Sequence, residues 1–500
     1  MGETSQLQKI VATVFHTFCF FASSTLLLSL PVLAQDLPAG TALEARLSSA
    51  TGSRISHPGD PIEATIIAPV SVRGRIIVPQ GSRLFGSIAN ATALGFGVKH
   101  STASIAYAFY TLQLPGGAAI PVHTQLVEVE TAKEHVDALG TVRGIHPMAS
   151  LSSSLAVFTV PLLLVDPAVG APVWCIKSLV APPANPEIHF ATGAELILRL
   201  TTAVALPANT DFRAPVESFS RGDLTDIGRL LKNSAQRAYM GSRASDLVNV
   251  LLIGSRTQVD QTFYAAGWLQ AQRKSPLSLY RMYHALTKRM GYPSAPMNGL
   301  TLNGVPSAFV HQKSLDTVEK RHHVRFWRYP GRSDIWLGAA AQDVGFRFKL
   351  AHWTHVTDPH IDRERDKVVN DLAFTGCVEA AGLLPRASAD LAQDPKAEHP
   401  IVTDGDVAVI RLNSCVHPKL MAGAGEMRAL HQRGRLASTL ATFRDDLVRS
   451  NIVFTTYNTL TFVVKHKAEP ATTHALLTNG EPRGLDWLTA IRPRKVAPRH

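Results

Sequence analysis

Asp246-Leu-Val-Asn-Val-Leu-Leu-Ile-Gly-Ser255 is the stretch that decides the fold of the C-terminal half of the chain. Apart from Asn249 its central residues are apolar, which is typical of a buried strand. The Gly-Ser pair at its end predicts a turn into a helix that Gly267 ends. One apolar face of this helix consists of Val259, Phe263 and Ala266. A strand, a turn and a helix in this order indicate a sheet packed against helices.

The residues that follow continue the mixture of helices and strands. Spacing and turn residues predict helices at 277–290 and 359–375, with strands between them at 300–302, 308–312, 322–328 and 334–341. Farther on, a strand at 406–412, a helix at 430–448 and a strand at 458–464 are expected. Strands in short succession after helices favour an α+β domain.

The N-terminal half has a different pattern. From Gly40 to Leu206, short β-type runs are broken by Gly and Pro, and helical periodicity is weak, so an all-β barrel or sandwich is expected. An apolar stretch at Leu155–Leu164 is too short to span a bilayer, and Pro161 would interrupt a helix there. A plain core segment is the simpler interpretation, and an insert that touches a membrane is the alternative.

Composition places the chain among multidomain globular proteins. With 500 residues, 45% apolar and 18% charged, it is expected to form two or three domains. The net charge of +11 favours anionic partners such as acidic lipid or envelope polysaccharide, although a diffusely basic surface explains it as well. Nucleic acid is disfavoured, because no basic module interleaved with aromatic residues is present.

The first 34 residues resemble a secretory leader. Lys9 precedes an apolar stretch, and Val32-Leu33-Ala34 has the small-residue pattern of a cleavage site. Cleavage after Ala34 is expected, with an uncleaved anchor as the alternative. The chain is therefore expected in the periplasm or cell envelope, where Cys175, Cys377 and Cys415 could form one disulfide; spacing leaves the pair open.

These patterns give a multidomain chain with a β-rich N-terminal domain and an α+β C-terminal domain. The expected divisions are a leader (1–34), a β-rich domain (35–210), a helical connector with a helix at 224–240 (211–245), the C-terminal domain (246–390) and an α+β extension with a basic tail (391–500).

Histidines gather in the C-terminal domain. Six of the 20 fall between His311 and His360, and imidazole is both a titrating group and a common metal ligand. Alternation along a strand at 321–327 places His322 on one face and His323 with Arg325 on the other. An imidazole beside a guanidinium suits an oxyanion. A half-exposed strand with surface His and Arg is the structural alternative.

A second group of candidates lies at the start of the helix at 359–375. Asp358 is expected to cap this helix, with Pro359 in its first turn. Arg365 falls on the apolar stripe and should need a carboxylate partner, and His360 and Glu364 lie one turn apart. An ordinary salt-bridged helix start is the structural alternative.

An ordered set of motifs in residues 246–376 resembles the LssY C-terminal domain family. The motifs are Asp246 to Ser255, Ala265-Ala-Gly-Trp268, Arg321-His-His-Val-Arg-Phe-Trp327, Trp336-Leu-Gly-Ala-Ala340 with Asp343, and Thr354-His355 with His360 to Asp366. The family that this region resembles takes its name from a protein of a secretion locus. Domains of this family also occur joined to membrane lipid-phosphatase domains. The resemblance carries over no catalytic residue. Gly304-Val305-Pro306 departs from the usual Gly-Arg-Pro, and Ala308 replaces an acidic residue, which weakens an anion-binding role for that loop.

The segment from Pro69 to Gly86 is similar to the β-barrel domain of TrbI-like secretion-channel proteins. This similarity covers some fifty residues. It implies a barrel and does not by itself imply a secretion channel.

Three functions are consistent with these patterns. In the first, the chain is an envelope protein that binds an anionic component such as lipid phosphate, and the candidate residues are His323, Arg325, His355, His360 and Arg365. The second is a metal-assisted phosphoester hydrolase, with a divalent ion held by residues among His322, His355, His360, Asp362 and Glu364. The third is a scaffold with protein partners in an envelope or secretion assembly.

Overall fold

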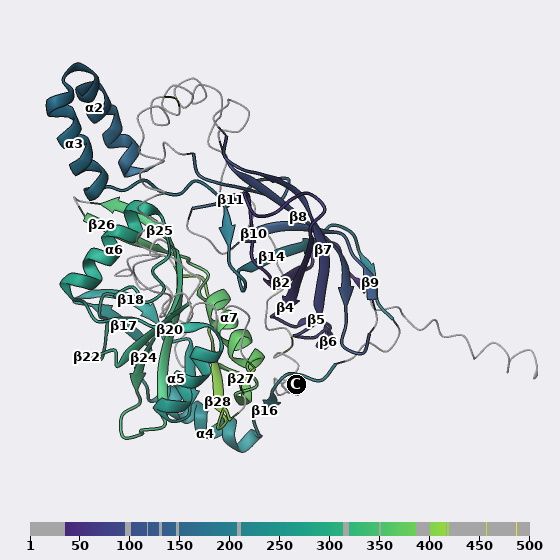
Figure 1. Cartoon of the computed structure of the whole chain (residues 1–500). Helices are drawn as coiled ribbons and strands as arrows, with labels where there is room; N and C mark the ends of the chain where they lie inside the picture. The colour runs from purple at the N-terminus through teal and green to yellow at the C-terminus, as the bar shows by residue number, and fades with distance from the viewer. Residues whose placement is uncertain are drawn as a thin grey trace, which may run out of the picture.

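The computed structural model describes residues 36–95, 102–117, 119–129, 133–146, 150–207, 212–313, 320–349, 352–386, 401–416, 418–419, 457 and 487. Two strand-rich halves lie side by side, and a pair of helices projects away from them (Figure 1). The expected leader and the elements expected at 430–448 and 458–464 lie outside the described residues. The division into domains at 210, 245 and 390 stays a prediction.

The N-terminal half is a nine-stranded antiparallel sheet that curls into a nearly closed barrel, which confirms the expected all-β domain (Figure 1). Alternate residues of its strands are buried, as the period of two requires. The strand order is β10 (Thr124–Val129), β14 (Glu195–Leu200), β2 (Ala42–Leu47), β4 (Pro61–Ile66), β7 (Arg83–Thr92), β8 (Ser104–Gln113), β12 (Thr141–Arg143) and β11 (His135–Val136), with β9 (Ala119–Pro121) beside β8. Three short pairs accompany this sheet: β1 (Asp36–Leu37) with β15 (Val204–Ala205), β3 (Thr51–Gly52) with β13 (His189–Phe190), and β5 (Val70–Val72) with β6 (Arg75–Val78).

The apolar stretch at Leu155–Leu164 is not a core segment, and that expectation was wrong. It belongs to a helical hairpin of α2 (Leu151–Val165) and α3 (Pro167–Val180), in which Phe158 and Leu164 are 76% and 68% exposed. Pro161 lies within α2 without ending it. None of the described helices is both long and apolar enough to cross a membrane.

The C-terminal half is built on a mixed nine-stranded sheet, which confirms the expected α+β class. Its order is β16 (Glu217–Ser218), β27 (Val378–Pro385), β28 (Asp406–Leu412), β19 (Val250–Ile253), β25 (Ile335–Lys349), β24 (Arg321–Arg328), β23 (Phe309–Lys313) and β20 (Trp268–Gln270), with β26 (His352–Thr357) beside β25. The pairs β16 with β27 and β19 with β28 are parallel, and the others are antiparallel.

Both faces of this sheet are covered. One face packs against α5 (Arg256–Ala265) and α7 (Ile361–Phe374), which bury Phe263 and Leu372. The other packs against α4 (Arg221–Lys232) and a small sheet of β18 (Arg243–Leu247), β17 (Arg237–Met240), β21 (Thr301–Leu302) and β22 (Val305–Pro306). The helix expected at 224–240 was therefore wrong beyond Lys232. There the residues of β17 pair with β18, and this tertiary pairing overrides local helical periodicity.

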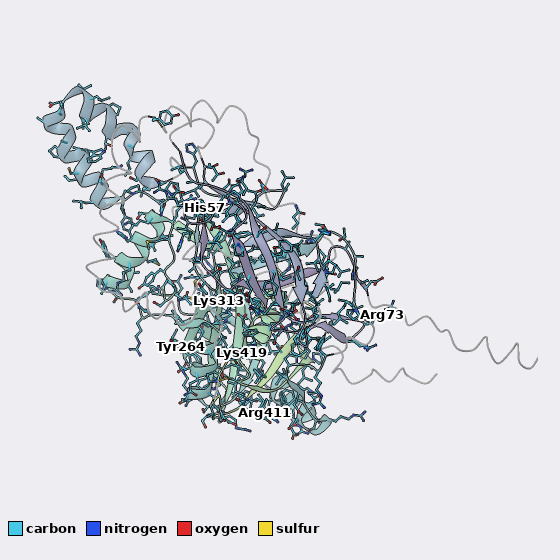
Figure 2. The ribbon with its side chains drawn as sticks, turned by 45° about the vertical axis from the view of Figure 1, so that its right-hand side comes forward. His57, Arg73, Tyr264, Lys313, Arg411 and Lys419 are labelled. Atoms are coloured by element: carbon cyan, nitrogen blue, oxygen red, sulfur yellow. A yellow bond between two sulfur atoms is a disulfide. The ribbon has the colours of Figure 1, made fainter. Side chains whose placement is uncertain are left out.

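Buried charges join the two halves. Glu195 of the barrel pairs with Arg46, with Lys313 at 2.9 Å and with Lys367, and Lys313 also pairs with Asp371. Figure 2 shows Lys313 in the middle of the molecule, where the two halves meet. Burial alone would raise the pKa of Glu195, but Arg46, Lys313 and Lys367 hold it well below its ordinary value. Glu195 is therefore an ionised carboxylate buried between the halves.

A disulfide joins Cys377 to Cys415, with 4.6 Å between their Cα atoms. It ties the turn after α7 to the chain just beyond β28. Cys175, on α3, is exposed and free.

Candidate functional site

Three polar side chains line up on one face of β24. Arg321, His323 and Arg325 alternate along the strand and are 4%, 2% and 7% exposed. The neighbouring strand β25 places Asp343 opposite Arg321, and Ala341 and Ala339 opposite the other two. These small residues leave room for the imidazole and the guanidinium. Because cores lie on both faces of the sheet, the half-exposed strand that the sequence allowed does not occur.

Asp343 is the centre of this group. Arg321 Nε donates a hydrogen bond to Asp343 Oδ2 at 2.8 Å. His355 Nδ1 and His323 Nδ1 lie 3.4 and 3.8 Å from the same oxygen. Burial alone would raise the pKa of Asp343, but His323, Arg321 and His355 together lower it to about 2. Arg321 supplies the permanent positive charge among them, because arginine does not deprotonate in proteins.

The two imidazoles are neutral at neutral pH. Burial lowers the pKa of His355 to about 4 and that of His323 well below its ordinary value. The other ring nitrogen of each faces a guanidinium, with His355 Nε2 at 3.2 Å from Arg321 Nη2 and His323 Nε2 at 2.8 Å from Arg325 Nη1. Since a guanidinium only donates, each Nε2 accepts, and the proton of each ring is on the Nδ1 that faces Asp343.

We call Arg321, His323, Arg325, Asp343 and His355 the Arg–His cluster. Together with Asp246 its formal charges are balanced, because Arg325 Nη1 donates to Asp246 Oδ2 as Arg321 Nε does to Asp343 Oδ2. Yet Arg321 Nη1 and Arg325 Nε are buried and find no hydrogen-bond acceptor among the described residues. The cluster reaches solvent at His355, whose side chain is 29% exposed. The arrangement therefore offers one spare buried donor on each guanidinium, and a neutral imidazole at the edge that reaches solvent.

The sequence placed His323, Arg325 and His355 among the anion-binding candidates, and the structure brings these three together. It does not bring His360 or Arg365 to them. Arg321, Asp343 and Asp246 were missed as site residues. Arg321 has the same strand parity as His323 and Arg325, which could have identified it, but no local pattern pairs Asp343 with β24.

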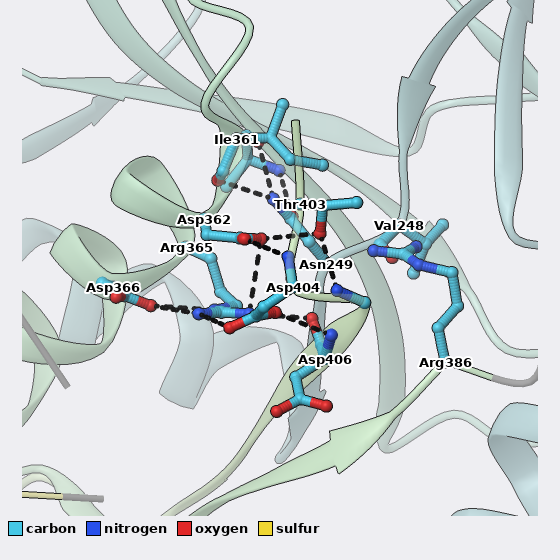
Figure 3. A network of polar contacts seen from close by, with 12 residues as sticks. Val248, Asn249, Ile361, Asp362, Arg365, Asp366, Arg386, Thr403, Asp404 and Asp406 are labelled. Atoms are coloured by element: carbon cyan, nitrogen blue, oxygen red, sulfur yellow. Dashed lines mark hydrogen bonds and ion pairs between the residues drawn. The ribbon is translucent and has the colours of Figure 1, made fainter. Parts of the chain in front are cut away.

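Arg365 lies in a separate polar network at the start of α7 (Figure 3). It is 1% exposed and donates to Asp404 Oδ1 at 2.7 Å and to Asp366 Oδ1 at 2.8 Å, so the expected carboxylate partners are present. Asp362 accepts from Thr403 Oγ1 at 2.8 Å. Because Nε, Nη1 and Nη2 of Arg365 all donate to these carboxylates, Arg365 is less suited to a further anion than Arg321 or Arg325.

The cap expected at Asp358 was wrong. Helix α7 begins at Ile361 with His360 as its N-cap, and no side chain caps it. The Asp358 carboxylate instead accepts from the backbone N–H of His360 at 2.9 Å. The chain makes one more turn after Pro359 before the helix begins. Asp358 therefore stabilises this turn and does not cap the helix.

The five metal candidates fall in three places. His322 Nδ1 lies 2.5 Å from Glu364 Oε2, on the face of β24 opposite His323. His355 belongs to the Arg–His cluster, and His360 and Asp362 lie at the start of α7. Burial raises the pKa of Glu364, which makes it a poorer metal ligand. In the described part of the chain, no three His, Cys, Asp or Glu side chains are grouped so as to hold a metal ion.

Residues 233–407 match the family model described as LssY C-terminus. The match contains the whole Arg–His cluster and confirms the resemblance that the sequence motifs indicated. No curated protein matches the chain. Among solved structures, ComB10 of the Com type IV secretion system of Helicobacter pylori aligns at 13% identity over 36% of this chain and 95% of its own, with a TM-score of 0.21. A likeness of that strength carries no argument about function.

Proposed function

We propose that this chain is a cell-envelope protein whose LssY-like region binds a phosphate-type anion at the Arg–His cluster. One observation carries the proposal: Arg321 Nη1 and Arg325 Nε are buried donors without an acceptor in the described residues. A buried donor that stays unpaired costs about 1–3 kcal/mol, and more on a charged group. Acceptor oxygens of a ligand would remove that cost.

The chemistry of the cluster favours an anion with several oxygens. Guanidinium groups form charge-assisted bonds with phosphate in a fixed fork geometry. The neutral His355 at the exposed edge accepts from Arg321 Nη2, so it helps to hold that guanidinium in place for a ligand. Asp343 and Asp246 hold the two guanidinium groups in place without filling all their donors.

Other features support an envelope location for such a ligand. The expected leader would export the chain, the Cys377–Cys415 disulfide suits an oxidising compartment, and the net charge is +11. Lipid head groups and phosphorylated polysaccharides both present phosphate there. The metal-assisted hydrolase has no comparable observation in its favour, since the metal candidates lie in three separate places.

Calorimetric titration of the full chain with inorganic phosphate tests this proposal. Arg321→Lys keeps the charge beside Asp343 but removes the spare donor, and we expect it to weaken phosphate binding at least tenfold. Arg325→Lys should act in the same direction. Arg328→Lys is the matched control, because Arg328 is exposed at the end of the same strand. Thermal melting shows whether each variant is folded.

The outcomes separate the proposal from its alternatives. Folded Lys variants that bind phosphate as tightly as the wild type would overturn it, as would a wild-type protein that binds no phosphate, phosphatidic acid or sugar phosphate. Titration with dispersed short-chain phosphatidic acid and with a sugar phosphate identifies the source of the anion. Tighter binding of one than of inorganic phosphate assigns the ligand to lipid or to polysaccharide.

A further inference from the structure

The hairpin of α2 and α3 is an exposed apolar feature of the molecule. From Leu151 to Val180 its only charged residues are Asp166, at the turn, and Lys177. Both helices project away from the two halves (Figure 1). The large apolar side chains that are more than a third exposed are Leu151, Leu155, Phe158, Leu164, Val165, Val169, Val173, Ile176, Leu179 and Val180. Exposed apolar patches of this kind mark surfaces that bind another protein, a ligand or a membrane.

Much of this apolar surface stays exposed when α2 and α3 pack against each other. Gly170 lies so close to α2 that a Cβ added to it would be 2.3 Å from Leu163 Cα. Ala156 is 1% exposed. Small buried residues thus form the inner contact, and the large apolar side chains point outward. Leu151, Leu155 and Phe158 of α2, and Val169, Val173 and Ile176 of α3, follow helical spacing, so each helix presents an apolar stripe away from the inner contact.

A basic helix lies at the base of the hairpin. Tyr283 Oη of α6 (Pro276–Lys288) donates to the Val180 carbonyl oxygen at 2.8 Å. Leu277, Leu279 and Tyr280 of α6 are 56%, 44% and 60% exposed. Five cations and no acidic residue occur between 271 and 300: Arg273, Lys274, Arg281, Lys288 and Arg289. Exposed leucine, tyrosine and cations side by side are typical of a helix at a membrane surface.

We propose that the hairpin and α6 together dock this protein onto an anionic lipid bilayer, with the hairpin lying in one leaflet. Helices of 15 and 14 residues are about 22 and 21 Å long, short of the roughly 30 Å of hydrocarbon in a bilayer. The hairpin therefore cannot cross. An ionised Asp166 is unfavourable at the bilayer centre, so the hairpin lies tilted with its turn near the head groups.

The cations in α6 and just before it select the charge of the membrane. Each lysine or arginine near an anionic surface adds to the attraction. The exposed residues Arg273, Lys274 and Arg281 have no neighbouring acid in the sequence to oppose them. None of these residues belongs to the Arg–His cluster, so membrane binding through this surface does not depend on the proposed phosphate site.

Flotation of the full chain with vesicles tests the docking surface. We expect binding to vesicles of 30% phosphatidylglycerol in phosphatidylcholine, and at least tenfold weaker binding by Phe158→Asp and by Ile176→Asp. Leu139→Asp is the matched control, because Leu139 is 83% exposed on the barrel side. A combined Lys274→Gln and Arg281→Gln variant should lose the preference for phosphatidylglycerol over pure phosphatidylcholine.

A second readout uses Cys175, which is exposed on α3. An environment-sensitive fluorophore on this thiol should shift to the blue when vesicles are added. The proposal would be overturned if folded Phe158→Asp and Ile176→Asp bound vesicles as tightly as the wild type does. It would also be overturned if the wild type did not bind vesicles. If sedimentation instead shows an oligomer that Phe158→Asp dissociates, without vesicle binding, a second copy of the chain covers the hairpin. Arg321→Lys should bind vesicles of phosphatidylglycerol through the hairpin as the wild type does, which separates this test from the phosphate site.

Discussion

Asp343 holds one guanidinium and two imidazoles in place, so single substitutions there should have large effects. Its carboxylate is 4% exposed and accepts from Arg321 Nε. Asp343→Ala would leave a buried arginine without its partner, and we expect a loss of about 3–5 kcal/mol in the free energy of unfolding. Urea denaturation measures this. Asp334→Ala removes an exposed carboxylate that pairs with Arg332, and it should change stability by less than about 1 kcal/mol.

His355 should make stability depend on pH. Its folded pKa is about 4, below the ordinary 6.5, so between pH 6.5 and 4 the unfolded chain binds more protons than the folded one. Stability from this residue is complete above pH 6.5 and declines as the pH falls through that window. We expect the difference in unfolding free energy between wild type and His355→Gln to decrease from pH 7 to pH 4. Parallel pH curves for the two proteins would contradict this assignment.

The sequence predicted three of the five residues of the Arg–His cluster. Strand alternation correctly put His323 and Arg325 on one face, and the density of histidine pointed to His355. Asp343 could not be found, because its place depends on the pairing of β25 with both β24 and β26 and on a bulge between Asp343 and Gly345. Long-range register of this kind has no local signature.

Elements with strong apolar patterns were predicted well, and elements decided by tertiary contacts were not. Helix α5 begins after a Ser255 capping box, as Gly-Ser suggested, and buries Val259 and Phe263. The segment at 237–240 became a strand because β18 offered it a partner. The α2–α3 hairpin was mistaken for core because apolar residues alone do not distinguish a buried segment from one that an external medium covers.

The close packing of α2 against α3 gives a testable prediction. Gly170→Leu places a side chain where only a hydrogen fits, since even a Cβ would be 2.3 Å from Leu163 Cα. We expect α2 and α3 to separate, with faster proteolysis between residues 151 and 180 and little change in the melting of the two halves. Gly228→Leu is the control, because a Cβ at Gly228 of α4 meets nothing within 4 Å. Equal cleavage rates for both variants would contradict the close packing.

In the molecule as a whole, the buried charges between the halves are the main interactions that hold the two halves together. Lys313 is 0% exposed and contacts both Glu195 of the barrel and Asp371 of α7. Trp268 Nε1 donates to the same Asp371 carboxylate at 2.9 Å, which fixes it further. Each half contains one pair of this network, Arg46–Glu195 or Lys313–Asp371, and the contacts of Lys313 and Lys367 with Glu195 cross between the halves. Because separating the halves would break these buried crossing pairs, we expect the halves to unfold together.

Lys313→Ala tests this coupling. We expect it to lower the free energy of unfolding by about 3–5 kcal/mol, because two carboxylates lose a buried partner. It should also split a single denaturation transition into two. Arg411→Ala breaks a partly exposed pair with Asp223 and should cost less than about 1 kcal/mol. A single, unshifted transition for Lys313→Ala would mean that the halves do not depend on this network.

The proposed function depends on an anion at the Arg–His cluster. Crystals of the full chain soaked in tungstate, a heavy analogue of phosphate, test it most directly, because tungsten is located by its anomalous scattering. We predict a peak whose oxygens lie within hydrogen-bond distance of Arg321 Nη1 or Arg325 Nε and which disappears in Arg321→Lys. An ordered water in that position, with tungstate bound only elsewhere on the surface, would contradict the assignment.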